Sequence, residues 1–335
     1  MLKRLSLILT ITSLVAVYYG LPITHALAAT TGTNSINAGQ ALEIAPPVIT
    51  LKVNPGQSVS VPIYLRDIAK TNLIVTGQAN DFVAAGEDGT PKLLLDNNQS
   101  DPYSMSSWVV SLPSLTLIPR EIKAMTVRLQ VPKNATPGGH YGVIRFTATP
   151  PNLDATGVSL SASLGALLLV TVNGQIKEDV SIQEFSVNQN GHASSFFEAP
   201  PVSFVERFKN NGNVHEQPTG QVTVTDMFGR KFAVVNVNVP ITNVLPDSTR
   251  KYEQVLDSAV IGNNAMFGRY TADLKATYGA NKRVLTSQLT FWVIPYRLIA
   301  IIVIGLVGGF FALRFFIRRY NRFIIGQAQR GRGRY

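Results

Sequence analysis

The sequence predicts an all-β protein, with two tandem immunoglobulin-like antiparallel β-sandwiches followed by one C-terminal transmembrane α-helix. Short runs of alternating apolar and polar residues, separated by Gly, Pro and Asn turns, fill residues 41–294, and such runs are typical of antiparallel sandwiches. An uncharged apolar run near the end of the chain is followed by arginines. The chain contains no cysteine, so we expect hydrophobic cores, and not disulfides, to hold the sandwiches together.

We expect the first sandwich over residues 41–173. From Val59 to Leu65 every second residue is apolar, which predicts a strand with one buried face. The preceding Asn-Pro-Gly-Gln, residues 54–57, is a turn sequence. The same reasoning predicts further strands over 73–79, 107–112, 123–131, 141–149 and 158–172.

The second sandwich is expected over residues 176–294, because the strand pattern restarts after Asn173-Gly174-Gln175. A hairpin loop is predicted at 226–230, between two runs rich in alternating valines. The last predicted strand leads directly into the apolar run, so this sandwich should lie close to a membrane. Its seven predicted strands are 180–187, 203–209, 221–226, 231–239, 250–256, 270–278 and 284–294.

The apolar run predicts a transmembrane helix over residues 297–317. The sixteen uncharged residues 298–313 would extend roughly 24 Å as a helix, slightly less than a hydrocarbon core of ~30 Å. Long arginine side chains at both ends can reach the headgroups, and aromatic residues upstream fit the interface. A buried helix of a soluble domain is the alternative, but such helices rarely end in clustered arginines. The expected interface anchors are Trp292, Tyr296, Arg297, Arg314, Arg318 and Arg319.

Charge predicts the orientation of this helix. Residues 314–335 contain seven arginines and no acidic residue, so the positive-inside rule places a basic tail, 318–335, in the cytoplasm. All 20 acidic residues lie within 30–296 and are matched there by basic ones, so the net charge of +10 comes from the chain ends. We therefore expect anionic lipids at the arginine-rich tail and no nucleic-acid partner.

The N-terminal segment predicts export. Residues 1–28 combine a basic start, an apolar stretch and an Ala-Leu-Ala cleavage sequence, as a signal peptide does. An uncleaved signal anchor is the alternative. Residues 29–40 are small and polar and should form a flexible leader. With one remaining span, the mature chain would have its N-terminus outside and its C-terminus inside.

Several segments resemble the WxL-interacting protein family of Gram-positive cell surfaces. They are residues 131–144 in the first sandwich, and 208–215, 268–270 and 291–295 in the second. The resemblance implies a first domain of peptidoglycan-binding type, a second domain for host or partner binding, and one C-terminal span with a basic tail.

The sequence contains no pattern typical of a catalytic, cofactor or metal site. His25 belongs to the predicted signal peptide, and His140, His192 and His215 are far apart in the sequence. No HExxH-like or GxSxG-like spacing is present. The oxygen-rich loop 96–101 lacks the glycine and distal glutamate of an EF-hand, so a polar turn is the favoured interpretation.

Loops at the ends of the sandwiches are the candidate partner-binding elements. Their composition points to 81–91, 96–102 and 210–218. Gly305 and Gly309 have the GxxxG spacing that permits close helix approach, and helix dimerisation is one possible use of it. The loop residues singled out are Asp96, Asn97, Asn98, Asp101, Asn210, Asn213 and His215.

These observations together predict a bacterial, non-enzymatic, single-pass protein of the cell membrane with most of its chain extracytoplasmic. Its sandwiches would bind an extracellular protein or a cell-wall polymer, either peptidoglycan or a surface-protein partner. The alternative is a membrane-tethered, chaperone-like assembly factor that holds secreted surface subunits by β-strand pairing. No cofactor is expected.

Overall fold

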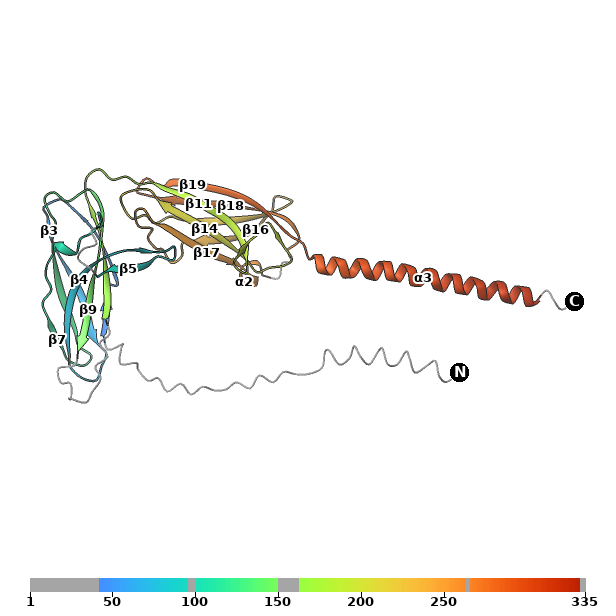
Figure 1. The fold of residues 1–335 in the computed structure, drawn as a ribbon, viewed down its shortest axis with the longest axis horizontal. Coiled ribbons are helices and arrows are strands. Elements are labelled where there is room, and N and C mark those ends of the chain that lie inside the picture. Colours follow the sequence, from blue (N-terminus) through green and yellow to red (C-terminus); the bar gives the residue numbers. More distant parts are fainter. Residues whose placement is uncertain (1–41, 96–100, 150–162, 263–265, 332–335) are drawn as a thin grey trace. The chain divides into compact units, whose positions relative to one another are not determined.

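Four β-sheets and one long helix make up the described structure (Figure 1). The computed structural model describes residues 42–95, 101–149, 163–262 and 266–331. The sheets pair into two sandwiches, each with its own hydrophobic core. The predicted fold class is confirmed. The predicted signal peptide, 1–28, and leader, 29–40, lie outside the described residues.

The first sandwich contains two mainly antiparallel sheets. A short 3₁₀ helix, η1 (Ser106–Trp108), precedes β6. One sheet has the order β1 (Leu42–Ala45), β3 (Ser58–Asp67), β8 (Ile122–Gln130) and β6 (Val109–Ser111). The other has the order β2 (Val48–Val53), β10 (Ser163–Val172), β9 (Gly138–Thr149), β4 (Leu73–Ala85) and β5 (Thr90–Leu94), with β7 (Leu115–Leu117) also paired to β4.

Strand β3 shows why the alternating pattern produces a sandwich. Val61, Ile63 and Leu65 are buried, while the residues between them are exposed. Ile63 lies opposite Met125 of β8, which is also buried. Each such side chain contributes about 1.5–3 kcal/mol when it leaves water, so the alternation sets which face of the strand packs inward.

The second sandwich repeats this arrangement. A one-turn helix, α2 (Ser258–Ile261), packs against β16 and β17. One sheet has the order β12 (His192–Ala193), β11 (Val180–Gln189), β14 (Val202–Asn210) and β17 (Thr249–Leu256). The other has the order β13 (Phe196–Phe197), β19 (Arg283–Val293), β18 (Gly268–Tyr278), β15 (Thr219–Asp226) and β16 (Lys231–Val237).

Aromatic side chains fill the core of the second sandwich. The ring centroid of Phe291 lies 5.9 Å from that of Phe204 and 5.7 Å from that of Tyr270. Phe291 therefore bridges the two sheets, since Phe204 belongs to the opposite one. Such aromatic pairs add stabilisation beyond the apolar area that they bury.

Two strand pairs differ from the antiparallel arrangement expected. β2 is parallel to β10, and β13 is parallel to β19. The first pair arises because the chain leaves one sheet after β1 and joins the other as β2. Pro46 and Pro47 lie at this crossing, where residues without an N–H interrupt the ladder at little cost.

The segment 81–91, expected as a loop, is mostly a β-hairpin. β4 extends to Ala85, a tight turn follows, and β5 begins at Thr90. Asp81 is a strand residue whose carboxylate accepts hydrogen bonds from the backbone N–H groups of Met105 and Ser106, at 2.7 and 2.6 Å. Its polar side chain therefore caps the turn of η1 and does not mark a loop.

Helix α3 (Tyr296–Gly331) follows β19 after only Ile294 and Pro295. Its portion Tyr296–Asn321 is long and apolar enough to cross a membrane, and the most apolar 18 residues within it are not buried in the protein. The helix begins one residue before the predicted span, 297–317. It also continues into the predicted basic tail, for which no helix was expected.

Candidate binding site

Asn210, expected from the sequence to lie in a loop, is the last residue of β14 and is fully buried. Its amide nitrogen donates to the carbonyls of Val214 and Val244, at 2.7 and 2.9 Å. Its side-chain oxygen accepts from the N–H of Gly212, at 2.9 Å. Because these bonds hold the loop in shape, Asn210 supports the surface that its neighbours form and is not itself at that surface.

Asn213 connects the two sandwiches. Its backbone carbonyl accepts from the N–H of Gly139, at 2.7 Å, and its side-chain nitrogen donates to the carbonyl of Pro137, at 3.2 Å. The same side chain donates to Gln175 and accepts from the N–H of Lys177, in the segment between the sandwiches. One asparagine thus binds the first sandwich, the connection and its own loop.

His215 packs against Tyr141 of β9. The Tyr141 hydroxyl lies 3.4 Å from Nδ1 of His215, and their ring centroids are 5.8 Å apart in an edge-on arrangement. Burial, followed by the nearby charge of Lys52, lowers the pKa of His215 to about 4. The imidazole is therefore neutral at physiological pH. Its contact with Tyr141 also links the two sandwiches, and we call the contacts between the sandwiches the joint.

Three further contacts join the sandwiches. The Tyr103 hydroxyl donates to the carboxylate of Asp247, at 2.9 Å, and burial together with this bond raises the pKa of Tyr103 to about 12. At the tip of the β4–β5 hairpin, the Glu87 carboxylate pairs with Arg207, at 2.7 Å, and the Glu87 carbonyl accepts from the N–H of Lys251, at 2.8 Å.

The predicted loop 96–102 contributes to this joint through Asp101. Its carboxylate accepts from the N–H of Tyr103, at 2.8 Å, which orients the tyrosine toward Asp247. Asp96, Asn97 and Asn98 lie outside the described residues. The described loop residues singled out from sequence, Asp101, Asn210, Asn213 and His215, therefore lie where the two sandwiches meet.

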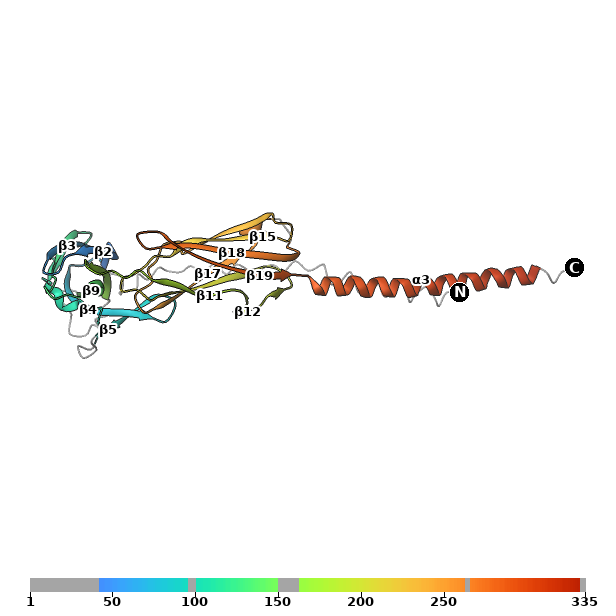
Figure 2. The same ribbon diagram turned by 90° about the horizontal axis from the view of Figure 1, so that it is seen from above.

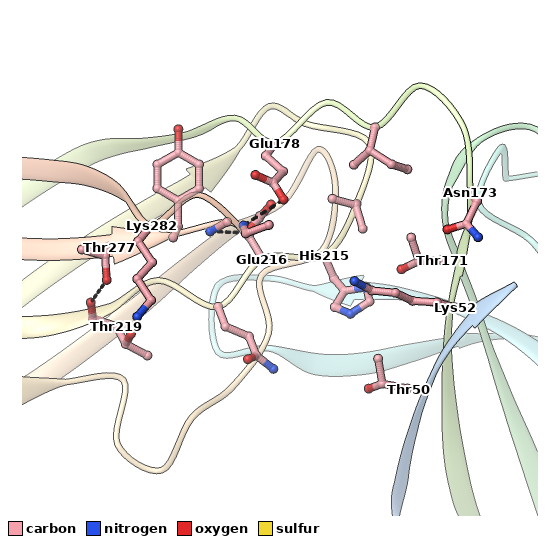
Figure 3. A pocket seen from close by; sticks show the side chains of 16 residues that line it. Thr50, Lys52, Thr171, Asn173, Glu178, His215, Glu216, Thr219, Thr277 and Lys282 are labelled. Atoms are coloured by element: carbon pink, nitrogen blue, oxygen red, sulfur yellow. Dashed lines mark hydrogen bonds between the residues drawn. The ribbon is translucent and has the colours of Figure 1, made fainter.

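A cavity of about 560 Å³ lies beside this joint (Figure 3). We call it the cleft. It receives side chains from β2 and β10 of the first sandwich and from the loops before β15 and after β18 of the second. The residues that line the cleft include Thr50, Lys52, Thr171, His215, Glu216 and Lys282.

Strand β2 forms one wall of the cleft and is also a sheet edge. Among the described strands it pairs only with β10. The carbonyls of Pro47 and Val53 accept from β10 and from the residue after it, and the parallel register implies that the backbone groups of Thr50 and Lys52 point away from β10. The cleft wall therefore offers strand hydrogen-bonding groups beside an exposed lysine.

Glu216 lies on the opposite wall, almost completely buried. Its carboxylate accepts from the N–H of Gly279, at 3.0 Å. Burial, and then the nearby charge of Glu178, raises the pKa of Glu216 to about 7. At neutral pH this carboxyl is partly protonated. It therefore offsets less of the positive charge of Lys52 and Lys282 than a fully ionised glutamate would.

The histidines do not assemble into a reactive group within the described structure. His140 is buried against Trp108, with ring centroids 4.5 Å apart, and its nitrogens lie near the carbonyls of Ser104 and Thr136. His192 is exposed on β12. Over the described ranges, no three His, Cys, Asp or Glu side chains gather closely enough to hold a metal ion.

Comparison with known proteins gives likeness to solved structures only. No family model matches the chain, and no curated protein sequence matches it. The class 5 fimbriae chaperone CfaA is 14% identical, over 74% of this chain and 98% of its own, with a TM-score of 0.37. The Salmonella enterica SafA pilin in complex with the SafB chaperone aligns at 10% identity, over 74% and 96%, with a TM-score of 0.35. The CsuC–CsuE chaperone-tip adhesion subunit complex from Acinetobacter baumannii aligns at 16% identity, over 63% and 89%, with a TM-score of 0.34.

These TM-scores are too low to support an argument from likeness. The fold assignment rests on the strand pairing within the four sheets.

The residues expected at a membrane interface lie around the start of α3 and along it. The indole of Trp292 stacks on the ring of Phe196, with centroids 6.0 Å apart. Arg297 lies 3.3 Å from the carboxylate of Glu198. Tyr296, Arg314, Arg318 and Arg319 are exposed on α3. Gly305 and Gly309 present open helix surface, since a Cβ at either would meet nothing within 4 Å.

Sequence reasoning missed Thr50, Lys52 and Phe196. β2 was not predicted as a strand, and nothing in one sequence shows that the connection after β14 comes to lie beside it. The run Val-Ile-Thr-Leu-Lys-Val at 48–53 carried a usable signal, because apolar and polar residues alternate from Ile49 to Val53.

Proposed function

We propose that this is a non-enzymatic, single-pass membrane protein whose two extracytoplasmic sandwiches bind an extended segment of a protein partner in the cleft. The observation that supports binding is the free edge of β2, where Thr50 and Lys52 line the cleft. An extended polypeptide can satisfy such an edge by pairing with it as an added strand. Lys52 and Lys282 would favour a segment that carries acidic side chains or a terminal carboxylate.

The anchoring part of the proposal rests on α3. Within Tyr296–Asn321 it contains an apolar, unburied stretch long enough to cross a membrane, and such a stretch is far more stable in a bilayer than in water. By the positive-inside rule, the arginines from Arg314 onward favour a cytoplasmic C-terminal end, with the sandwiches outside.

The resemblance to the WxL-interacting protein family supports a partner at the bacterial cell surface. It leaves open a cell-envelope polymer, such as peptidoglycan, in place of a protein. A β-strand edge favours the protein, because strand backbone groups are best satisfied by another polypeptide, whereas a glycan offers no regular amide ladder. A test of the proposal must therefore be able to detect a bound glycan as well as a bound protein.

The cleft's own polar groups support a binding role over a catalytic one. The neutral imidazole of His215 contacts Tyr141, and the carboxylate of Glu216 is bonded to the backbone at Gly279. A general base must be free to reach a substrate proton, and both groups are engaged in holding the protein's structure.

A chaperone-like assembly factor is the second candidate, and the start of β10 favours it. Residues 163–166 pair with β9 on one side and with no described strand on the other. This stretch contains neither Pro nor Lys, whereas the edge strand β5 carries Pro91 and Lys92 and the edge strand β17 carries Arg250 and Lys251. Charges and prolines protect an edge from pairing, so residues 163–166 are the less protected site.

Site-specific photocrosslinking in intact cells tests both candidates. A photoreactive residue would be placed at Thr50 in the cleft, at Ser163 on β10, or at exposed Lys70 as a control. We expect the Thr50 variant to give a crosslinked product, identified by mass spectrometry as one peptide segment, that the Lys70 variant does not give. Lys52→Glu should reduce this product several-fold, whereas Lys92→Glu should leave it unchanged.

Each result has a distinct meaning. A protein product from Ser163 alone would favour the assembly factor, and a glycan product from Thr50 would move the proposal to a polymer ligand. If neither site crosslinks while the protein is present at normal abundance in the membrane, the binding proposal is wrong.

A further inference from the structure

Exposed apolar side chains gather at one end of the second sandwich. Phe228 is 74% exposed, Phe196 63%, Phe267 58% and Met227 43%, and Trp292 is 37% exposed. We call these five residues the end patch. Large apolar side chains this exposed usually mark an interaction surface when several lie together.

Strand register shows that these residues lie together at the end from which α3 leaves. Asp226 of β15 is opposite Tyr270 of β18, which is opposite Phe291 of β19. The turn that contains Met227 and Phe228 therefore extends beyond this rung in the same direction as the end of β19.

The remaining members of the end patch occupy the same level. Gly268, which follows Phe267, is opposite Val293, and Phe196 of β13 is opposite Trp292. β19 ends at Val293 and α3 begins at Tyr296 (Figure 2). Only three residues, Val293 to Pro295, thus separate Trp292 of the end patch from the start of α3.

The β15–β16 turn is built to hold its apolar side chains outward. The Asp226 carboxylate accepts from the N–H groups of Phe228 and Arg230, both at 2.9 Å, and from the side chain of Arg230. The Arg230 guanidinium lies over the Phe228 ring, 5.3 Å from its centroid. The Met227 side chain packs over Gly268, where a Cβ would lie 1.9 Å from its Cε.

Basic side chains surround the end patch. Lys231 and Arg269 are exposed beside it, in addition to Arg230. Of the acidic residues at this end, Asp226 is ion-paired with Arg230 and Glu198 with Arg297, and Asp257 accepts from backbone N–H groups at the start of α2. An apolar centre with exposed bases at its border matches an anionic lipid surface.

We propose that the end patch inserts into the headgroup region of the same bilayer that α3 spans, so that the second sandwich is docked on the membrane at two places. This rests on the proposed anchoring by α3. The occupant is anionic lipid, because exposed bases border the end patch and only three residues separate Trp292 from the start of α3. Docking would fix the height of the cleft above the membrane and restrict rotation of the second sandwich about α3.

The absence of cysteine makes a direct test possible in the full chain, since any introduced cysteine is the only one. The protein would be reconstituted into phosphatidylcholine–phosphatidylglycerol vesicles with a polarity-sensitive fluorophore on a single cysteine. Three variants carry the label: Met227→Cys in the end patch, Val307→Cys in α3, and Val284→Cys near the opposite end of β19, where the native side chain is 56% exposed. Quenching by brominated lipid reports contact with the bilayer.

We expect several-fold greater quenching at positions 227 and 307 than at 284. Adding Phe228→Ser and Phe267→Ser should reduce quenching in the Met227→Cys variant to the level at 284. The same two substitutions should leave quenching in the Val307→Cys variant unchanged. Replacing phosphatidylglycerol with phosphatidylcholine should lower quenching at 227 alone.

The possible failures are distinguishable. A label at 227 that stays water-like while the one at 307 is quenched would overturn docking and leave the anchor intact. A label at 307 that is not quenched would instead overturn the anchoring on which the inference rests. A blue shift at 227 that depends on the protein-to-lipid ratio, without lipid quenching, would assign the end patch to a second copy of the chain and also overturn the proposal.

Discussion

Glu206 lies on the face of β14 that carries Phe204 and Phe208, inside the second sandwich, and is fully buried. Burial, and to a lesser extent the charge of Glu253, raises the pKa of Glu206 to about 8. The neighbouring Gln254 amide, in the orientation that satisfies both groups, donates to this carboxyl. A protonated carboxyl with one amide partner is tolerable in a core, whereas the carboxylate is costly there.

Stability should therefore depend on pH through Glu206. The unfolded chain loses this proton near the ordinary value of 4.5, whereas the folded protein holds it to about pH 8. Between these values the folded state binds more protons, so the free energy of unfolding falls as pH rises through this window. We expect Glu206→Gln to raise the free energy of unfolding at pH 8 by about 1–3 kcal/mol and to change it little at pH 4.5.

Thermal unfolding of the full chain in detergent, followed by near-ultraviolet circular dichroism, measures this difference. Glu253→Gln is the matched control, because Glu253 lies on adjacent β17 with its side chain 44% exposed and paired with Lys251. An equal gain from both variants, or a Glu206→Gln gain that does not change with pH, would contradict the assigned cause.

The elements that join the sandwiches are a strand end and a loop that sequence reasoning treated as separate. Gly138 begins β9 with φ of +127°, and a Cβ there would lie 2.5 Å from the carbonyl oxygen of Asn213. The glycine is required for two reasons: the backbone conformation and the close approach of the second sandwich. The bond from Gly139 to Asn213 depends on the same approach.

Gly138→Ala should therefore weaken the joint. We expect a loss of about 2–4 kcal/mol in the free energy of unfolding, compared with about 1 kcal/mol for Gly191→Ala. Gly191 also has positive φ, +80°, but a Cβ there would meet nothing within 4 Å. Limited proteolysis at the connection, 173–176, should speed up for Gly138→Ala only. Equal losses of unfolding free energy in both variants would show that backbone strain alone causes the loss and that the contact with Asn213 does not contribute.

At the scale of the whole molecule, the described structure combines the cleft, the contacts that join the two sandwiches and an apolar helix that follows the second sandwich after two residues. Each is incomplete alone. Residues of both sandwiches line the cleft, and the contacts of the joint hold these two walls next to each other. Helix α3 would keep both sandwiches at the cell surface. The end patch would add a second membrane contact to this arrangement.

Membrane topology can be tested with the same cysteine-free background. With the proposed orientation, Lys70→Cys should react with a membrane-impermeant maleimide in intact cells, because Lys70 is exposed on the first sandwich. Gln329→Cys, in the arginine-rich end, should react only after permeabilisation. The reverse labelling pattern would invert the orientation, and labelling of both positions in intact cells would mean that α3 does not span the membrane.

The main strands could be predicted because alternation between two faces is a local property. Val59, Ile63 and Leu65 reveal a buried face whatever the strand later pairs with, and the apolar run after Arg297 is equally local. The short strands β2 and β13 were not predicted: β13 has too few residues to show any periodicity, and the parallel partners of both strands lie far along the chain. The hairpin 81–91 was mistaken for a loop because its acidic residues cap and pair with distant elements.

By itself, then, the sequence determined the two-sandwich class, the long apolar helix and the basic chain end. These features could be predicted because alternation of apolar and polar residues, and local charge, can be recognised within a short stretch of sequence. Only the tertiary structure decided what Asn210, Asn213 and His215 do, namely brace a loop and join two sandwiches. It also decided that Thr50 and Lys52 line a cleft and that Phe196, Phe228 and Phe267 share one end of a sheet. These relations depend on strand order and register, which are set by packing between residues distant in the chain.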